Sequence, residues 1–91
     1  MGVPQHRYTA LARFLDAEPR SAVRLSFATV EEVLGAPLPP SARNHRAWWG
    51  NETAARHVQA KAWMAVGWRV SAVNLTAEQV TFVRAWGRVA A

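Results

Sequence analysis

The feature that most constrains this sequence is the segment at residues 38–51, LPPSARNHRAWWGN, in which two tryptophans are adjacent. Amphipathic stretches lie on both sides of it. A large apolar indole is either buried in a core or stacked on a partner. Adjacent side chains point in different directions, so we expect one of Trp48 and Trp49 to enter the core. The other is then available for stacking on a ligand or for a protein interface.

A chain of 91 residues, 51% of them hydrophobic, is long enough for one small domain with its own core. The absence of cysteine excludes disulfides and thiolate metal sites. No apolar run has the length of a membrane span, and the N-terminus lacks the apolar block of a signal peptide. We therefore expect a cytoplasmic protein with no membrane partner, a flexible arm at residues 1–6 and a frayed tail at 87–91.

Two short elements are predicted near the N-terminus. Apolar side chains recur at helical spacing over residues 8–15, which indicates a helix at about 9–17. Pro19 ends this helix, because the residue before a proline avoids the helical region. Apolar and polar side chains then alternate over residues 23–27, which predicts a short strand with one buried face.

A second helix is predicted at residues 27–34. Ser26 is a typical N-cap, and Gly35 stands where a left-handed C-terminal cap belongs. In the tryptophan-containing segment that follows, we expect Ser41 to cap one short helical turn that ends by Arg46.

A third helix is predicted between Asn51, as its N-cap, and Gly67, just past its end. A helical wheel separates an apolar side, expected to pack on the core, from a side of small, polar and basic groups, expected to face outward. The predicted core side comprises Ala55, Val58, Ala62, Ala65 and Val66, and the predicted outward side comprises Thr53, Arg56, His57, Ala60 and Met64, with Lys61 at its margin.

The C-terminal third predicts an antiparallel hairpin of strands at 68–74 and 80–86, both rich in β-branched and aromatic residues. Trp63 and Trp68, on either side of the end of the third helix, are expected in the core. The strand residues expected on the core side are Val70, Val80 and Phe82.

The element order is helix, short strand, helix, irregular segment, helix and hairpin. This is the order of an α+β, winged-helix-like domain, in which the short first strand pairs with the hairpin. One feature departs from that fold: residues 35–51 separate the second and third helices, whereas a helix-turn-helix uses three or four residues. Either the tryptophan-containing segment is an insertion at the turn, or the fold is another α+β arrangement with the same order.

Several motifs resemble those of a small, largely uncharacterised bacterial and phage domain family. The resemblance covers residues 8–84, and it implies no particular activity and no site residues. Its motifs are YxxLxxFL at 8–15, LSFxxxExVLG at 25–35, LPxSAR at 38–43, AWWxN at 47–51 and AWxxxGWxV at 62–70.

Catalysis is not expected. His45, Asn51 and His57 invite comparison with His-Asn-His nucleases, but their spacing is shorter and more even than in that metal finger, and no nearby acid completes a metal shell. We therefore predict no catalytic residue, no metal site and no cofactor.

The charge balance points to a polyanionic partner. Eleven Lys and Arg oppose six Asp and Glu, for a net charge of +5, and Lys61 is the only lysine. Arginine binds phosphates and guanine edges through two parallel hydrogen bonds, and a small basic domain is typical of nucleic-acid binding. Arginine abundance also accompanies a GC-rich genome, which gives part of this count another explanation.

The basic residues concentrate between residues 43 and 61. We therefore expect a DNA-binding module, such as a phage or bacterial transcription regulator, whose third helix enters a groove. Trp48 and Trp49 are candidates for stacking or an interface. The residues predicted to contact DNA are Ser41, Arg43, Asn44, Arg46, Thr53, Arg56, His57 and Lys61, with Arg69 and Arg84 of the hairpin as wing contacts.

Two alternatives remain open at this point. In the first, the arginines have no binding role and are either solvated or paired with Glu31, Glu32 and Glu52 in weak surface salt bridges. Otherwise the chain is a protein-interaction module, such as a phage-encoded inhibitor or an accessory subunit that binds a host protein through exposed tryptophan and arginine. A homodimer is compatible with either function.

Overall fold

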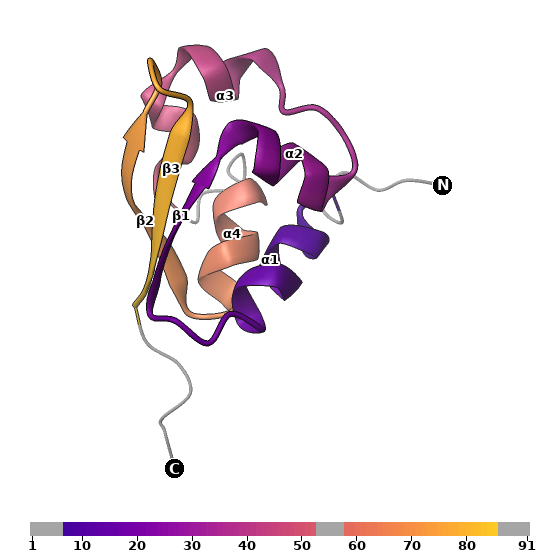
Figure 1. The fold of residues 1–91 in the computed structure, drawn as a ribbon, viewed down its shortest axis with the longest axis vertical. Helices are drawn as coiled ribbons and strands as arrows, with labels where there is room; N and C mark the ends of the chain where they lie inside the picture. The colour runs from indigo at the N-terminus through magenta and orange to yellow at the C-terminus, as the bar shows by residue number, and fades with distance from the viewer. Residues whose placement is uncertain (1–6, 53–57, 86–91) are drawn as a thin grey trace.

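The computed structural model describes residues 7–52 and 58–85. A three-stranded antiparallel sheet forms one layer, and helices cover one of its faces (Figure 1). The predicted α+β class is confirmed. The elements are α1 (Thr9–Asp16), β1 (Ala22–Ser26), α2 (Phe27–Leu34), α3 (Pro40–Asn44), the 3-10 helix η2 (Arg46–Trp49), α4 (Val58–Ala65), β2 (Trp68–Asn74) and β3 (Gln79–Arg84).

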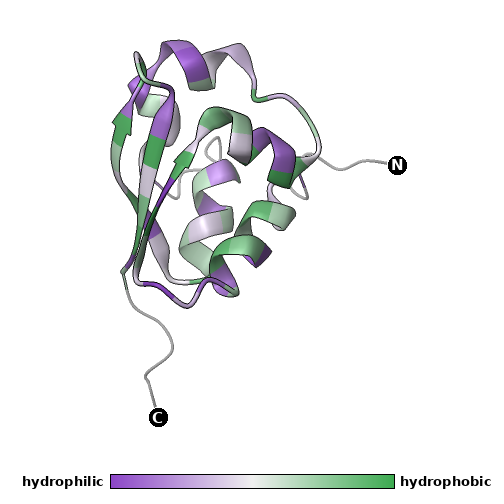
Figure 2. Cartoon of the chain, viewed as in Figure 1, coloured by the Kyte–Doolittle hydropathy of each residue, from purple (hydrophilic) through white to green (hydrophobic). Residues whose placement is uncertain are grey.

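The strand order is β1-β3-β2, so the short first strand pairs with the hairpin as predicted. Leu25 of β1 is opposite Val80 of β3, and Val70 of β2 is opposite Phe82. Figure 2 shows hydrophobic and hydrophilic residues alternating along the strands. The register shifts once between Val70 and Ala72, where a bulge interrupts the β2–β3 ladder.

The caps of α2 are as predicted. The Ser26 hydroxyl accepts a hydrogen bond from the Thr29 backbone N–H at 3.0 Å. Gly35 adopts φ 74°, the left-handed conformation that glycine reaches without a Cβ clash. Phe27, which is the last residue of the predicted strand and the first of the predicted helix, belongs to the helix, and its N–H donates to the Glu78 carbonyl of the hairpin turn at 2.8 Å.

The core lies between the sheet and the helices, and a chain of aromatic rings runs through it. Trp49 stacks on Phe27 at 5.1 Å and on Trp63 at 6.1 Å between ring centroids. Trp63 in turn meets Phe82 of β3 edge-to-face at 5.3 Å. The expectation that Trp63 and Trp68 are core residues is confirmed, because both are fully buried.

Ser41 does not cap the short helix in the tryptophan-containing segment. Pro39 occupies the N-cap position of α3, Pro40 is its first residue, and no side chain caps it. A proline at the first helical position has its φ preset and has no N–H to satisfy. The helix therefore begins two residues earlier than predicted and ends at Asn44.

The predicted orientation of the third helix is wrong over its described part. Ala60, expected to face outward, is fully buried together with Trp63, and Gln59 is also buried. Ala65, expected in the core, is exposed, and Ala62 is only half-buried. The large indole of Trp63 fixes the rotation of α4, because its burial removes far more apolar area from water than that of an alanine.

Candidate functional site

The tryptophan segment, residues 38–51, holds the layers of the domain together. Trp49 is 1% exposed, and its indole N–H donates to the Ala42 carbonyl at 2.8 Å. Trp48 is half-buried against Tyr8, with ring centroids 5.8 Å apart. The prediction that one of the paired indoles enters the core is confirmed. The other indole packs on Tyr8, at the N-terminal end of α1.

Arg43 lies in a cluster of ion pairs. Its guanidinium is 2.9 Å from the Glu31 carboxylate and 2.7 Å from that of Glu78, and it lies 5.7 Å above the Phe27 ring. The backbone N–H of Leu38 and then Arg43 hold the pKa of Glu31 below its ordinary value, and the same carboxylates raise the pKa of Arg43. Arg43, predicted as a phosphate contact, therefore links α2, α3 and the hairpin turn.

Two other polar residues of the segment cover the outer edge of β2. The Asn51 amide donates to the Val70 carbonyl at 2.8 Å, while its oxygen accepts from the Val70 N–H at 2.7 Å and from the Trp63 indole at 3.0 Å. Arg46 donates to the Val73 carbonyl. An uncovered edge strand exposes unpaired backbone groups that promote aggregation, and these side chains satisfy several of them. The predicted N-cap contact of Asn51 lies outside the described residues.

Arg84, predicted as a wing contact, is also a packing residue. It donates to the Glu18 carbonyl at 2.6 Å, and its guanidinium lies 4.7 Å above the Trp68 ring. Glu18 itself pairs with Arg20 at 2.8 Å. The guanidinium of Arg84 thus fixes the turn after α1 to the start of β2.

The sheet face turned away from the helices has a different character, and we call it the open face. Alternation along β1 buries Val23 and Leu25 and leaves Arg24 exposed. In the same way, β2 exposes Arg69. The residues of the open face are Ala22, Arg24, Arg69, Ser71, Ala72, Asn74, Gln79, Thr81 and Val83.

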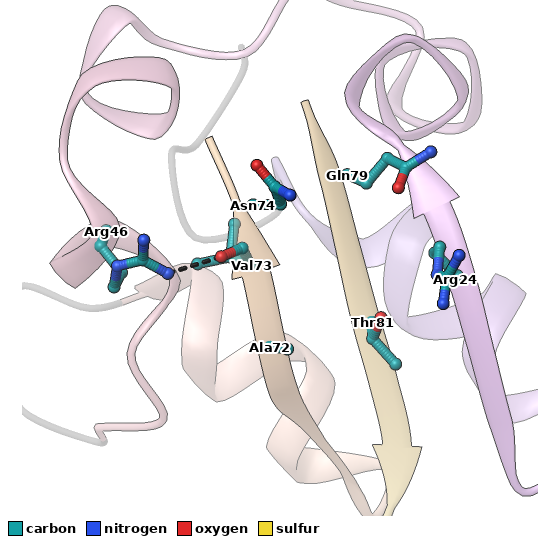
Figure 3. Close-up of a pocket in the computed structure, with 7 residues that line it drawn as sticks. All are labelled: Arg24, Arg46, Ala72, Val73, Asn74, Gln79 and Thr81. Atoms are coloured by element: carbon teal, nitrogen blue, oxygen red, sulfur yellow. Dashed lines mark hydrogen bonds between the residues drawn. The ribbon is translucent and has the colours of Figure 1, made fainter. Parts of the chain in front are cut away.

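A shallow hollow of about 460 Å³ lies on this face (Figure 3). Arg24 borders it from β1, and Arg46 borders it from η2, beside β2 at the opposite edge of the sheet. Gln79 and Thr81 of the central strand lie between the two arginines. The remaining lining residues are Ala72, Val73 and Asn74.

The positive charge of the open face is not compensated within the described part of the chain. There, neither Arg24 nor Arg69 makes an ion pair or a side-chain hydrogen bond. No acidic residue is among those that line the hollow. The open face therefore presents guanidinium donors to solvent with no internal acceptor.

The structure does not bring the predicted DNA contacts together. Arg46 lines the hollow and Arg69 is on the open face, whereas Lys61 borders a separate depression between α1 and α4. Ser41 and Asn44 are exposed on α3. The predicted contacts Thr53, Arg56 and His57 lie outside the described residues.

Sequence reasoning missed Arg24, Asn74, Gln79 and Thr81. The signal that identifies Arg24 was present, because its position between the buried Val23 and Leu25 turns it to the other face of the strand. The pairing of β1 with β3 then places it beside Thr81. That register depends on tertiary packing and is not visible in local spacing.

Among residues 7–52 and 58–85, no group of three or more His, Asp or Glu side chains lies close enough to hold a metal ion. In the same residues, no helix has both the length and the apolar character needed to span a bilayer.

Fold and surface together define a small α+β domain with one covered and one open sheet face. The model of the family described as Domain of unknown function (DUF7662) matches residues 8–85, and the chain belongs to this family. Membership agrees with the expectation of an uncharacterised family, while a phage origin stays a prediction. Searches of curated proteins and of solved structures found no match.

Proposed function

We propose that this chain is a non-enzymatic nucleic-acid-binding module that contacts the phosphate backbone of duplex DNA through its open face. The observation that supports this most strongly is the pair of exposed arginines, Arg24 and Arg69. Within the described chain they have no partner, and none of the helices described there covers their face of the sheet. Arg46, at the rim of the hollow, keeps donors beyond its bond to Val73.

The spacing of these arginines suits a backbone rather than one small anion. Arg24 lies on β1, and Arg69 lies on β2, with β3 between them. Two strand spacings separate the outer strands by about 9.5 Å, so the two guanidiniums contact different phosphates. Arginine–phosphate contacts position a protein on the duplex and supply most of its sequence-independent affinity.

Duplex DNA fits the open face better than unpaired strands do. Proteins that bind single strands stack bases on aromatic side chains. Among the described residues of the open face there is no aromatic side chain, since the strand aromatics Trp68 and Phe82 are buried on the helix side.

The proposal differs from the winged-helix interpretation in the element that contacts DNA. The element order and the β1–β3 pairing are compatible with it. However, the described part of α4 exposes only Lys61 and Ala65 and buries Ala60. We therefore place the DNA contact on the sheet instead of on this helix, and we keep regulation of transcription in a bacterium or phage as the proposed role.

A duplex titration at two salt concentrations tests the proposal. Three phosphate contacts give a slope of about −2.7 for log K against log salt, so affinity falls about 40-fold between about 50 mM and about 200 mM salt. Fluorescence anisotropy of a labelled duplex measures this directly. Absence of duplex binding at the lower concentration would contradict the proposal.

The protein-interaction alternative needs exposed indoles. Of the four tryptophans in the described residues, Trp49, Trp63 and Trp68 are fully buried and Trp48 is half-buried. Trp86 lies outside the described residues. Capture from a bacterial lysate with and without nuclease separates the two functions, because only nucleic-acid-dependent capture disappears after nuclease treatment.

A further inference from the structure

We infer that the central strand of the open face recognises base edges in the major groove, with Gln79 and Thr81 as the specificity-determining residues. This inference rests on the proposed function and adds its ligand class: duplex DNA of a preferred sequence, rather than any duplex. The observation behind it is the arrangement of neutral polar side chains between two arginines (Figure 3).

The position of β3 favours such a role. Gln79 and Thr81 are two residues apart on the middle strand and line the same hollow. Arg24 lies on one side of these two residues and Arg46 on the other. A major groove about 12 Å wide admits a two-stranded β-ribbon, and the inferred docking turns the middle strand of this sheet toward the bases while the flanking arginines contact phosphates.

The chemistry of these side chains also fits base recognition. A glutamine carboxamide donates and accepts at once, which matches the N6 and N7 edge of adenine. Within the described chain, the side chains of Gln79 and Thr81 make no hydrogen bond, so both remain available to a ligand. Asn74 differs, because its oxygen already accepts from the Ala77 N–H at 2.9 Å. Its amide donors make no hydrogen bond within the described chain, and they suit acceptors such as those of guanine.

Gln79 is only half-exposed, which restricts its side chain before binding. A side chain that is already restricted loses less conformational entropy when a base pairs with it. This distinguishes Gln79 from the fully exposed polar residues elsewhere on the surface.

The test is selection of bound sequences from a random duplex pool, followed by affinity measurements on the enriched site and on a scrambled duplex. The full-length chain is expected to enrich a short motif that contains adenine. Gln79→Ala is expected to lower the preference for the motif over its single-base variants by roughly 5- to 150-fold at one position, with unchanged affinity for scrambled DNA.

Thr81→Val is a second variant that keeps the β-branched shape and removes only the hydroxyl. It is expected to reduce selectivity at a neighbouring position. Thr9→Val is the matched control, because Thr9 is a half-buried threonine at the start of α1, in the helical layer. Circular dichroism and thermal melting establish that each variant is folded.

The outcomes separate this inference from the proposed function. Duplex binding without an enriched motif overturns the inference and leaves backbone binding intact. An enriched motif whose selectivity survives both Gln79→Ala and Thr81→Val in folded protein also overturns it. Absence of any duplex binding overturns both.

Discussion

The tryptophan segment and the open face use arginine in opposite ways. In the segment, Arg43 is bound to two carboxylates and lies over an aromatic ring. On the open face, Arg24 projects from a short strand with no partner in the described chain. The segment is dense in the residue types that dominate interfaces, yet Trp49 and Arg43 make internal contacts, and of its two arginines Arg46 alone borders the hollow. The local density of tryptophan and arginine therefore indicates a segment that holds the fold together. The positive charge that is available to a ligand lies on the open face, where strand alternation places it.

The largest expected difference between the two regions is in stability. Trp49→Ala removes an indole packed between Phe27 and Trp63 and is expected to lower the free energy of unfolding by roughly 3–5 kcal/mol. Arg24→Gln on the open face is expected to change it by no more than about 0.5 kcal/mol. Urea denaturation followed by circular dichroism measures both. Equal effects of the two changes on the free energy of unfolding would contradict the distinction between a stabilising segment and a ligand-binding face.

Asn51→Ala is expected to have the next largest effect. The change leaves the Trp63 indole N–H and both backbone groups of Val70 without their partner, at a cost of roughly 2–4 kcal/mol. It also uncovers the edge of β2, so concentration-dependent aggregation is expected in light scattering. Asn44→Ala, which removes an exposed carboxamide from α3, is the stability control. A stable, monomeric Asn51→Ala protein would show that the side chain is dispensable at this edge.

A smaller effect is expected when the two kinds of arginine are compared directly. Arg43→Gln breaks the pairs with Glu31 and Glu78 and is expected to lower the melting temperature while leaving duplex affinity nearly unchanged. Arg24→Gln is expected to lower duplex affinity while leaving the melting temperature nearly unchanged. Thermal melting and anisotropy on the same preparations give both quantities. Loss of duplex affinity in an Arg43→Gln protein that is fully folded would show that Arg43 also contacts the ligand.

The smallest expected effect is a pH dependence from Glu31. Hydrogen bonds from Leu38 and Arg43 hold its pKa below the ordinary value of 4.5, so the folded state favours the charged form. The resulting stabilisation is complete above that ordinary value and is lost as the pH falls through the lowered pKa of the folded state. Glu31→Gln should therefore lower stability at neutral pH and flatten its decline in acid. Urea midpoints across the acid range measure this, and identical pH curves for both proteins would contradict it.

Much of the fold was predictable because it depends on local spacing. The bounds of α1 and α2, the Ser26 and Gly35 caps and the inward-facing Val80 and Phe82 all follow from helical or strand periodicity. The rotation of α4 was not predictable in this way, since alanines occur on opposite sides of the helix and the position of one indole decides which side is buried.

The candidate site was predicted less well, for a physical reason. Whether Arg43 is available depends on its distance to Glu31 and Glu78, which are far from it along the chain. The sequence predicts Arg69 as a contact, but the strand predicted at 80–86 begins one residue after Gln79 and leaves Gln79 in the connection between the strands. The arrangement that brings Arg24 and Gln79 to one hollow follows from the β1–β3 register, which only the folded chain shows.

The central claim is that the unpaired arginines of the open face bind DNA phosphates. It is tested most directly by the salt dependence of duplex affinity for the Arg24→Gln/Arg69→Gln double variant. Arg13→Gln is its control, because it also removes an exposed arginine, but from α1 in the helical layer. The account predicts that the slope of log K against log salt becomes shallower by about 1.8 in the double variant and does not change in the control. An unchanged slope in the folded double variant, or an equal loss in the control, would contradict it.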